Sequence, residues 1–115
     1  MSAGIASILY PVTDLARAKA VYTTLFGVQP HVDSSYYVGF QVNGQEIGLV
    51  PNGQRQGLTG PTPYVQVDDI NQRVEQLVAA GATVQQQPRD VGGGRLVALA
   101  SDADGNALGL IQDPH

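Results

Sequence analysis

Two apolar runs, each followed by a segment of helical periodicity, divide the chain into similar halves. Residues 5–12 are rich in branched side chains and lead to Asp14, and residues 64–67 lead in the same way to Asp69. A carboxylate directly before a periodic segment is typical of a helix start, because it accepts a backbone N–H of the first turn. Each half is therefore predicted to begin with a strand that runs into a helix.

Apolar residues recur at spacings of three and four over residues 14–26 and 69–80, which predicts two amphipathic helices. Gly27 and Gly81 follow these segments, and glycine is well suited to the left-handed conformation that ends a helix. The faces that we expect to be buried consist of Leu15, Ala18, Val21, Tyr22 and Leu25 in the first helix, and of Ile70, Val74, Leu77 and Val78 in the second.

Three further strands are expected after each helix. Asn43-Gly44 is a strong signal for a two-residue hairpin turn, and Asp104-Gly105 marks the turn into the last strand. Each half is then predicted to run strand, helix, strand, strand, strand. The expected strands after the helices are residues 28–32, 36–42 and 45–50 in the first half, and 82–87, 96–100 and 107–111 in the second.

The two halves also share short sequences in the same order. Residues 12–15 (VTDL) overlay residues 67–70 (VDDI), and residues 47–50 (IGLV) overlay residues 108–111 (LGLI). Ordered matches of this kind favour an internal duplication. The Gly- and Pro-rich residues 51–61 are predicted to link the halves, so that the 115 residues form a single domain of two modules, about 1–51 and 61–115.

Composition excludes several classes of partner. Hydrophobic residues make up 43% of the chain and the net charge is −4, which fits a folded protein without the clustered basic surface that nucleic acids require. No apolar run approaches the ~20 residues of a membrane-spanning helix. We therefore expect neither a nucleic-acid nor a membrane partner.

The chain has no cysteine, which excludes a disulfide framework, a thiolate metal site and a cysteine nucleophile. Its first residues carry no basic side chain ahead of the apolar run, unlike a secretory signal. Both observations favour a cytoplasmic location.

Two segments carry a resemblance to a known family. Residues 11–22 (PVTDLARAKAVY) resemble the strand-to-helix segment of the vicinal oxygen chelate superfamily, which includes glyoxalases, bleomycin resistance proteins and extradiol dioxygenases. Residues 102–106 (DADGN) resemble its "D-P-D-G-N" turn, with Ala103 in place of proline. The resemblance implies an α+β fold in which two βαβββ modules form a cup-shaped mixed sheet, with helices on the convex side and a ligand in the hollow. It also implies a homodimer.

Metal-dependent members of that superfamily take ligands from the first and last strands of each module. Carried over by position, these sites fall on Ser7, Gly48, Thr62 and Gly109. Glycine has no side chain and a neutral hydroxyl is a poor ligand for a transition metal ion. We therefore expect no metal and no other cofactor, and we interpret Gly48 and Gly109 as emptied ligand positions that leave room in the hollow.

Alternation along the strands sends one set of side chains toward the helices and the other set into the hollow. The second set is apolar and aromatic with a few amides and hydroxyls, which suits a small organic ligand. The same residues could instead fill a small core or a dimer seam. The predicted ligand-binding residues are Ser7, Leu9, Tyr37, Gln41, Gly48, Thr62, Tyr64, Gln66 and Gly109.

Two functions follow, and both are kept open. The first is a metal-independent binding protein for a small molecule, an antibiotic being one possibility, with no catalytic residue. The alternative is a metal-dependent lyase or dioxygenase of the glyoxalase type, with a displaced site around His31, Asp33 or Glu46. His31 lies at the end of a predicted strand, two residues before Asp33, so both could face the same side and bind an ion or act as acid and base. His115 is expected to be frayed. A structural domain without a ligand is a third reading.

Overall fold

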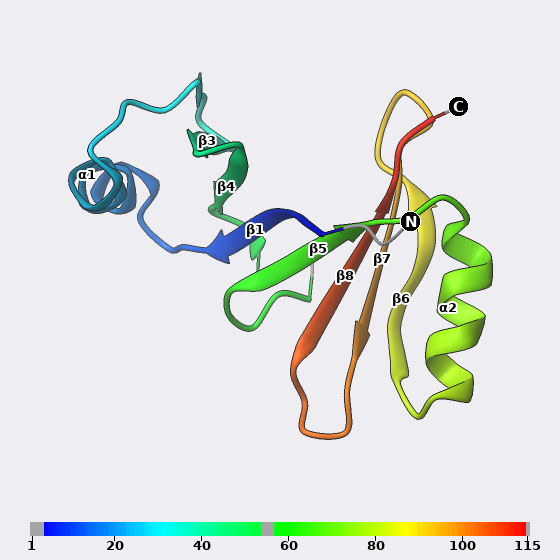
Figure 1. The fold of residues 1–115 in the computed structure, drawn as a ribbon. Helices are drawn as coiled ribbons and strands as arrows, with labels where there is room; N and C mark the ends of the chain where they lie inside the picture. The colour runs from blue at the N-terminus through cyan, green and yellow to red at the C-terminus, as the bar shows by residue number, and fades with distance from the viewer. Residues whose placement is uncertain (1–3, 54–56, 115) are drawn as a thin grey trace. The chain divides into compact units, whose positions relative to one another are not determined.

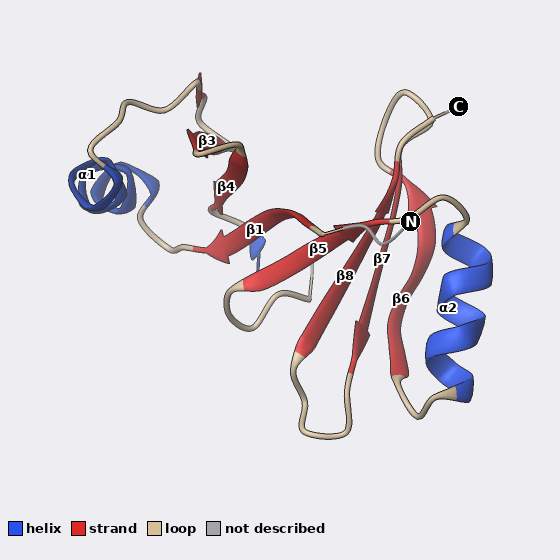
Figure 2. Cartoon of the chain, viewed as in Figure 1, coloured by secondary structure: helices blue, strands red, loops and turns tan. Residues whose placement is uncertain are grey.

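A computed structural model describes residues 4–53 and 57–114 of the chain (Figure 1). The chain forms two compact units: Ser7–Thr62 make up one, and the chain from Pro63 onward, with the residues before Ser7, makes up the other. We call them the first and second modules and describe each by itself, each strand being assigned to the module that holds most of its residues. Figure 2 shows that each module combines strands with one long helix.

Among its described residues, the first module contains the helix α1 and the strands β1 to β4. The strands are ordered β2-β3-β4-β1, with β1 parallel to β4 and antiparallel pairing elsewhere. The elements are β1 (Ile5–Pro11), α1 (Leu15–Phe26), β2 (Val32–Asp33), β3 (Val38–Val42) and β4 (Gln45–Val50).

Helix α1 begins and ends where the sequence predicts. Asp14 caps its start by accepting the backbone N–H of Arg17 at 3.0 Å, and Gly27 ends it with φ 71°. The predicted buried face was wrong in part, because Val21 and Leu25 are 57% and 67% exposed. The face that packs on the sheet consists instead of Leu15, Ala18, Tyr22 and Phe26, which also lie at spacings of three and four.

Aromatic size explains this rotation of α1. Tyr22 and Phe26 belong to a row of rings that starts at Tyr10 and ends at Phe40, with centroids 5.2 to 5.9 Å apart. Rings bury more apolar area than Val21 and Leu25 would. They therefore decide which side of the helix meets the buried residues of β3 and β4, namely Val38, Phe40, Ile47 and Leu49.

The segment between α1 and β3 contains less strand than predicted. Residues 28–31 are not a strand, and β2 is confined to two residues. Pro30 explains the difference, because it lacks the N–H that a sheet ladder requires. The turn between β3 and β4 agrees with the prediction: Asn43 and Gly44 have φ values of 51° and 80°, as a two-residue turn of type I′ requires.

The second module repeats this plan. Its strands are ordered β5-β8-β7-β6, with β5 parallel to β8 and antiparallel pairing elsewhere. The elements are β5 (Thr62–Gln66), α2 (Ile70–Ala79), β6 (Thr83–Asp90), β7 (Leu96–Ser101) and β8 (Ala107–Gln112).

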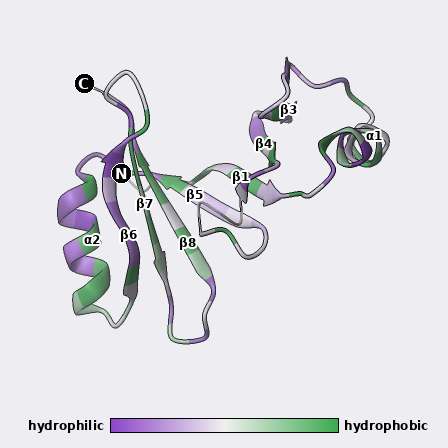
Figure 3. Cartoon of the chain, turned by 180° about the vertical axis from the view of Figure 1, so that it is seen from behind, coloured by the Kyte–Doolittle hydropathy of each residue, from purple (hydrophilic) through white to green (hydrophobic). Residues whose placement is uncertain are grey.

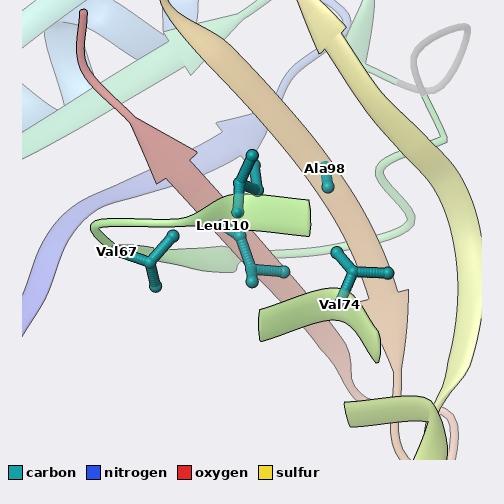
Figure 4. Packing of buried hydrophobic residues seen from close by; sticks show 5 residues of the cluster. Val67, Val74, Ala98 and Leu110 are labelled. Carbon is teal, nitrogen blue, oxygen red and sulfur yellow. The ribbon is translucent and has the colours of Figure 1, made fainter. Parts of the chain in front are cut away.

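Helix α2 contacts β6, β7 and β8. Asp69 caps its start by accepting the backbone N–H of Gln72 at 3.1 Å, as predicted. Val78 was expected to be buried but is 51% exposed, since Ile70 and Val74 already fill the contact face. Hydrophilic and hydrophobic residues therefore share the surface of α2, as Figure 3 shows. Figure 4 shows the core beneath the helix, where Val67, Val74, Ala98 and Leu110 converge.

The segment predicted to be a plain linker contains a packed residue. Leu58 is 1% exposed, and its N–H donates to the carbonyl of Gly53 at 2.9 Å. Residues 54–56, also part of that prediction, lie outside the described residues. Leu58 therefore fixes part of the connection by burial, whereas composition alone indicated only a loop.

The predicted fold class is confirmed: the chain is an α+β protein of two βαβββ modules. Within residues 4–53 and 57–114, no helix is both long and apolar enough to cross a membrane.

Candidate functional site

The candidate site lies on the first module, on the face of β3 and β4 that points away from α1. Phe40 and Ile47 are buried toward the helix. Because successive side chains of a strand point to opposite faces, Gln41 and Glu46 point to the other side. These two residues are Cα partners in the β3–β4 ladder.

Glu46 is the centre of a cluster of polar side chains. Its Oε1 lies 2.8 Å from Nε2 of His31 and accepts Nε2 of Gln41 at 2.7 Å. Its Oε2 accepts the hydroxyl of Tyr37 at 2.6 Å. We call His31, Tyr37, Gln41 and Glu46 the Glu46 cluster. The side chains of His31 and Glu46 are 43% and 22% exposed, so the cluster is open to solvent.

The cluster fixes the hydrogen-bonding roles of its members. An ionised carboxylate only accepts, so the Nε2 atom of His31 carries the proton in its contact with Glu46. In the neutral imidazole, Nδ1 is then the acceptor. A backbone hydrogen bond also helps to position His31, because its main-chain N–H donates to the carbonyl of Gly39 at 2.9 Å.

The side chains of the Glu46 cluster pack directly over the backbone of Gly39. A Cβ atom at this position would stand 2.7 Å from Oε2 of Glu46, 2.7 Å from Cε2 of Tyr37 and 3.3 Å from Nε2 of His31. Only glycine lets these three side chains meet above the strand. The predicted lining omitted Gly39 and Glu46, although alternation places both on the same face as Gly48.

The room expected at Gly48 is filled by a tyrosine. A Cβ atom at Gly48 would stand 2.5 Å from both Cε1 and the hydroxyl oxygen of Tyr37, and 2.7 Å from Cδ2 of Leu9. Leu9 and Ser7 lie on the adjacent strand as the Cα partners of Gly48 and Glu46. The room that the missing side chain of Gly48 leaves is therefore taken up, beside the glycine, by a ring of this chain.

The second module shows a similar arrangement at Gly109. A Cβ atom there would stand 2.5 to 2.7 Å from Cδ2, Cγ and Cε2 of Tyr64, its Cα partner on β5. Burial raises the pKa of Tyr64, and the positive charge of Arg89 opposes part of that shift. Gln66 is the Cα partner of Ile111 further along the same ladder. Space at Gly109 is therefore also occupied.

The second module does not repeat the Glu46 cluster. Gly39 opposes Gly48 in the first module, and Leu99 opposes Gly109 in the second. In this register Ala107 stands where Glu46 stands. An apolar pair therefore replaces Gly39 and the central carboxylate, and the cluster is specific to the first module.

The positions implied for metal ligands do not fit a metal. Thr62 is fully buried, and its hydroxyl donates to the carbonyl of Gly60 at 2.9 Å. Gly48 and Gly109 supply no donor atom and are covered by rings. Ser7 leaves one neutral hydroxyl, which is a poor ligand for a transition metal ion. Among the described residues, no group of three His, Asp or Glu side chains could hold a metal ion.

The structure brings together some of the residues named for a displaced site and separates others. His31 contacts Glu46, whereas Asp33 forms an ion pair with Lys19 of α1. His31 and Asp33 thus have different partners, because the segment before β2 is not a regular strand. His115 lies outside the described residues.

Comparison with known proteins identifies the family. Residues 4–110 match the Glyoxalase/Bleomycin resistance protein/Dioxygenase superfamily. The chain belongs to this superfamily, as the strand-to-helix and turn segments indicated.

Two curated proteins are similar to this chain in sequence. The chain is 29% identical over 110 residues to "Putative glyoxylase CFP32" of Mycobacterium tuberculosis and to the protein of the same name of Mycobacterium bovis. The match covers 87% of this chain but 42% of each relative, so the chain spans less than half the length of the curated relatives it matches.

Solved structures agree on the fold. A glyoxalase/bleomycin resistance protein/dioxygenase superfamily member from Vibrio splendidus superposes with a TM-score of 0.73 at 14% identity, covering 98% of this chain and all of that one. The methylmalonyl-CoA epimerase of Mycobacterium tuberculosis gives a TM-score of 0.66 at 16% identity, covering 97% and 89%. At such identities the similarity establishes the architecture alone.

Proposed function

We propose that this chain binds a small organic molecule and needs no resident metal to do so. The observation that carries the proposal is the chemistry of four positions. These are the positions at which metal-dependent members of the superfamily have their metal ligands. Ser7 and Thr62 offer hydroxyls, and Gly48 and Gly109 are covered by tyrosine rings. A divalent transition ion requires imidazole, carboxylate or thiolate groups, so these positions do not support metal-dependent chemistry.

The Glu46 cluster supports the binding half of the proposal. It combines an aromatic ring, an amide, an imidazole and a carboxylate on one exposed face of the first module. Small-molecule sites usually pair apolar and aromatic area with a few fixed polar groups. Three hydrogen bonds to one carboxylate hold these groups in place before a ligand arrives, which lowers the ordering cost of binding.

The test has a metal arm and a ligand arm. The purified protein is incubated with zinc, nickel, manganese and ferrous ions, loose ions are removed, and metal per chain is measured. EDTA-treated protein labelled with ¹⁵N is then titrated with a panel of aromatic compounds that includes bleomycin. We expect almost no bound metal, and amide shifts at Gly39 and Gly48 with at least one compound. One ion per chain, or no response to any compound, contradicts the proposal.

One contact favours the alternative, a lyase or dioxygenase with a displaced site. His31 lies 2.8 Å from Glu46, and an imidazole paired with a carboxylate is a common arrangement for proton transfer or metal binding. That function predicts stoichiometric metal and loss of turnover in His31→Ala. The metal arm therefore separates the two functions before any substrate is known.

A further inference from the structure

Most hydrogen-bond donors of the Glu46 cluster are engaged within the cluster, whereas several of its acceptors are not. The Nε2 proton of His31, the hydroxyl of Tyr37 and an amide N–H of Gln41 all point to one carboxylate. A carboxylate offers about four acceptor sites, of which these contacts occupy three. Nδ1 of neutral His31 and the amide oxygen of Gln41 are acceptors as well. A ligand therefore meets a surface richer in acceptors than in donors.

The cluster also carries a net negative charge. Tyr37 and Gln41 are neutral, and the carboxylate of Glu46 is 22% exposed. When His31 is neutral, no positive side chain contacts Glu46 through the hydrogen bonds and ion pairs described for it. The nearest acidic residue along the chain, Asp33, is already paired with Lys19. One uncompensated charge therefore remains, and it belongs to Glu46.

We propose that the Glu46 cluster selects ligands with a cationic N–H group, such as an amidinium, guanidinium or ammonium, and that protonation of His31 abolishes this selection. The inference rests on the proposed binding function and names the chemical class of its ligand. A cation donates to the partly exposed carboxylate and to the neighbouring acceptors. When His31 gains a proton, it becomes the cation that compensates Glu46, and the ligand's charge is no longer favoured.

The groups that face His31 can be named from each element of the first module around it. On β4, Glu46 is its ion-pair partner. On β3, the carbonyl of Gly39 accepts the backbone N–H of His31. Tyr37, just before that strand, donates its hydroxyl to the same carboxylate that His31 contacts, that of Glu46. On β2, Asp33 is compensated by Lys19 of α1. Histidine is the side chain that ordinarily changes charge between pH 5 and 8, so the comparison is made at pH 8 and pH 5.5.

The experiment compares benzamidine with benzamide, which have nearly the same shape but differ in charge. Dissociation constants are measured by ¹H–¹⁵N NMR titration at pH 8 and pH 5.5, where benzamidine is cationic throughout. We expect benzamidine to bind about two- to fivefold more tightly than benzamide at pH 8, the range for one partly exposed charge pair. At pH 5.5 we expect the two compounds to bind with equal affinity. In each titration the backbone amide signals of Gly39 and Glu46 should shift.

Variants make the test specific. Glu46→Gln should remove the preference at pH 8, whereas Glu75→Gln, the same charge change on the exposed surface of α2, should leave it unchanged. His31→Gln should retain the preference at pH 5.5, because no imidazole is present to compensate the carboxylate. If Glu46→Gln fails to fold, the His31→Gln variant and the wild-type pH comparison still decide the matter.

Each outcome has a defined meaning. Equal affinities at pH 8, or a preference in the wild type that persists at pH 5.5, overturn the inference. If neither probe binds but another compound of the panel does, the inference fails and the proposed function stands. If neither the probes nor any panel compound binds, both fail.

Discussion

The ring of Tyr64 lies directly against the backbone of Gly109, its Cα partner on the neighbouring parallel strand. A methyl group on Gly109 would stand 2.5 Å from Cδ2 and 2.6 Å from Cγ of the ring. Because Cγ is the base of the ring, small side-chain rotations cannot relieve the contact. Tyr64 is also 9% exposed, so the ring has little space to move into.

Gly109→Ala is therefore expected to destabilise the protein by about 1–3 kcal/mol, the usual cost of overpacking a filled site. Urea unfolding measures the change. Gly60→Ala is the matched control, since a Cβ there meets nothing within 4 Å. Equal stability of the two variants would show that the ring does not occupy this place.

Gly39→Ala should have a different effect, on the geometry of the Glu46 cluster more than on stability. The added methyl would meet Oε2 of Glu46 and the edge of the Tyr37 ring, which are far ends of side chains and can shift. We expect a loss of at most about 1 kcal/mol together with a displaced histidine. The ¹H–¹⁵N spectrum of the His31 ring reports the displacement, and an unchanged imidazole signal would contradict the expectation.

Leu58→Ala should cost about 2–5 kcal/mol, as for other truncations of fully buried leucines. Leu58 is 1% exposed although it lies in a connecting segment. Leu25→Ala removes the same atoms from a residue that is 67% exposed and should be nearly neutral. Thermal unfolding of both variants checks the prediction, and similar melting temperatures would refute it.

The turn at Asp102 gives a prediction about pH. Hydrogen bonds from the side chain and backbone of Asn106, with a further one from the N–H of Asp104, lower the pKa of Asp102. A lowered pKa in the folded state means that the ionised group contributes stability above its unfolded pKa of about 3.9, and that this contribution is lost as the pH falls.

Asp102→Asn should therefore be less stable than the wild type at pH 7, and the difference should shrink as the pH falls below about 4. Melting temperatures of both proteins from pH 7 to pH 2.5 test this. A difference that is constant over that range would mean that the charge of Asp102 is not what the turn stabilises.

Local rules predicted the framework of this fold. Asp14 and Asp69 were recognisable as helix caps, and Asn43-Gly44 as a hairpin turn, because such signals act through neighbouring backbone groups. The rotation of α1 was not predictable in the same way. Val21 and Leu25 fit the helical period as well as Tyr22 and Phe26 do, and only the partner rings on the sheet decide between them.

The candidate site was predictable only in part. Alternation places Gln41, Glu46 and Gly48 on one face, so the register of β3 and β4 could have indicated the carboxylate. The sequence named both His31 and Glu46 for a displaced site but not their contact, because His31 lies in an irregular segment whose path depends on Pro30 and the short strand β2. The tyrosine rings that cover Gly48 and Gly109 could not be predicted either. A glycine within a strand indicates that some group approaches the backbone closely, but not which group.

The two rings that cover these glycines do not come from matching places in the modules. Tyr64 belongs to β5, where the first module has Leu9, and Tyr37 precedes β3 at the register position that Val97 takes in the second module. If both halves descend from one repeated unit, as their shared segments indicate, no single ancestral tyrosine accounts for both rings. The close contact between a tyrosine ring and a strand glycine is therefore made from a different position in each module.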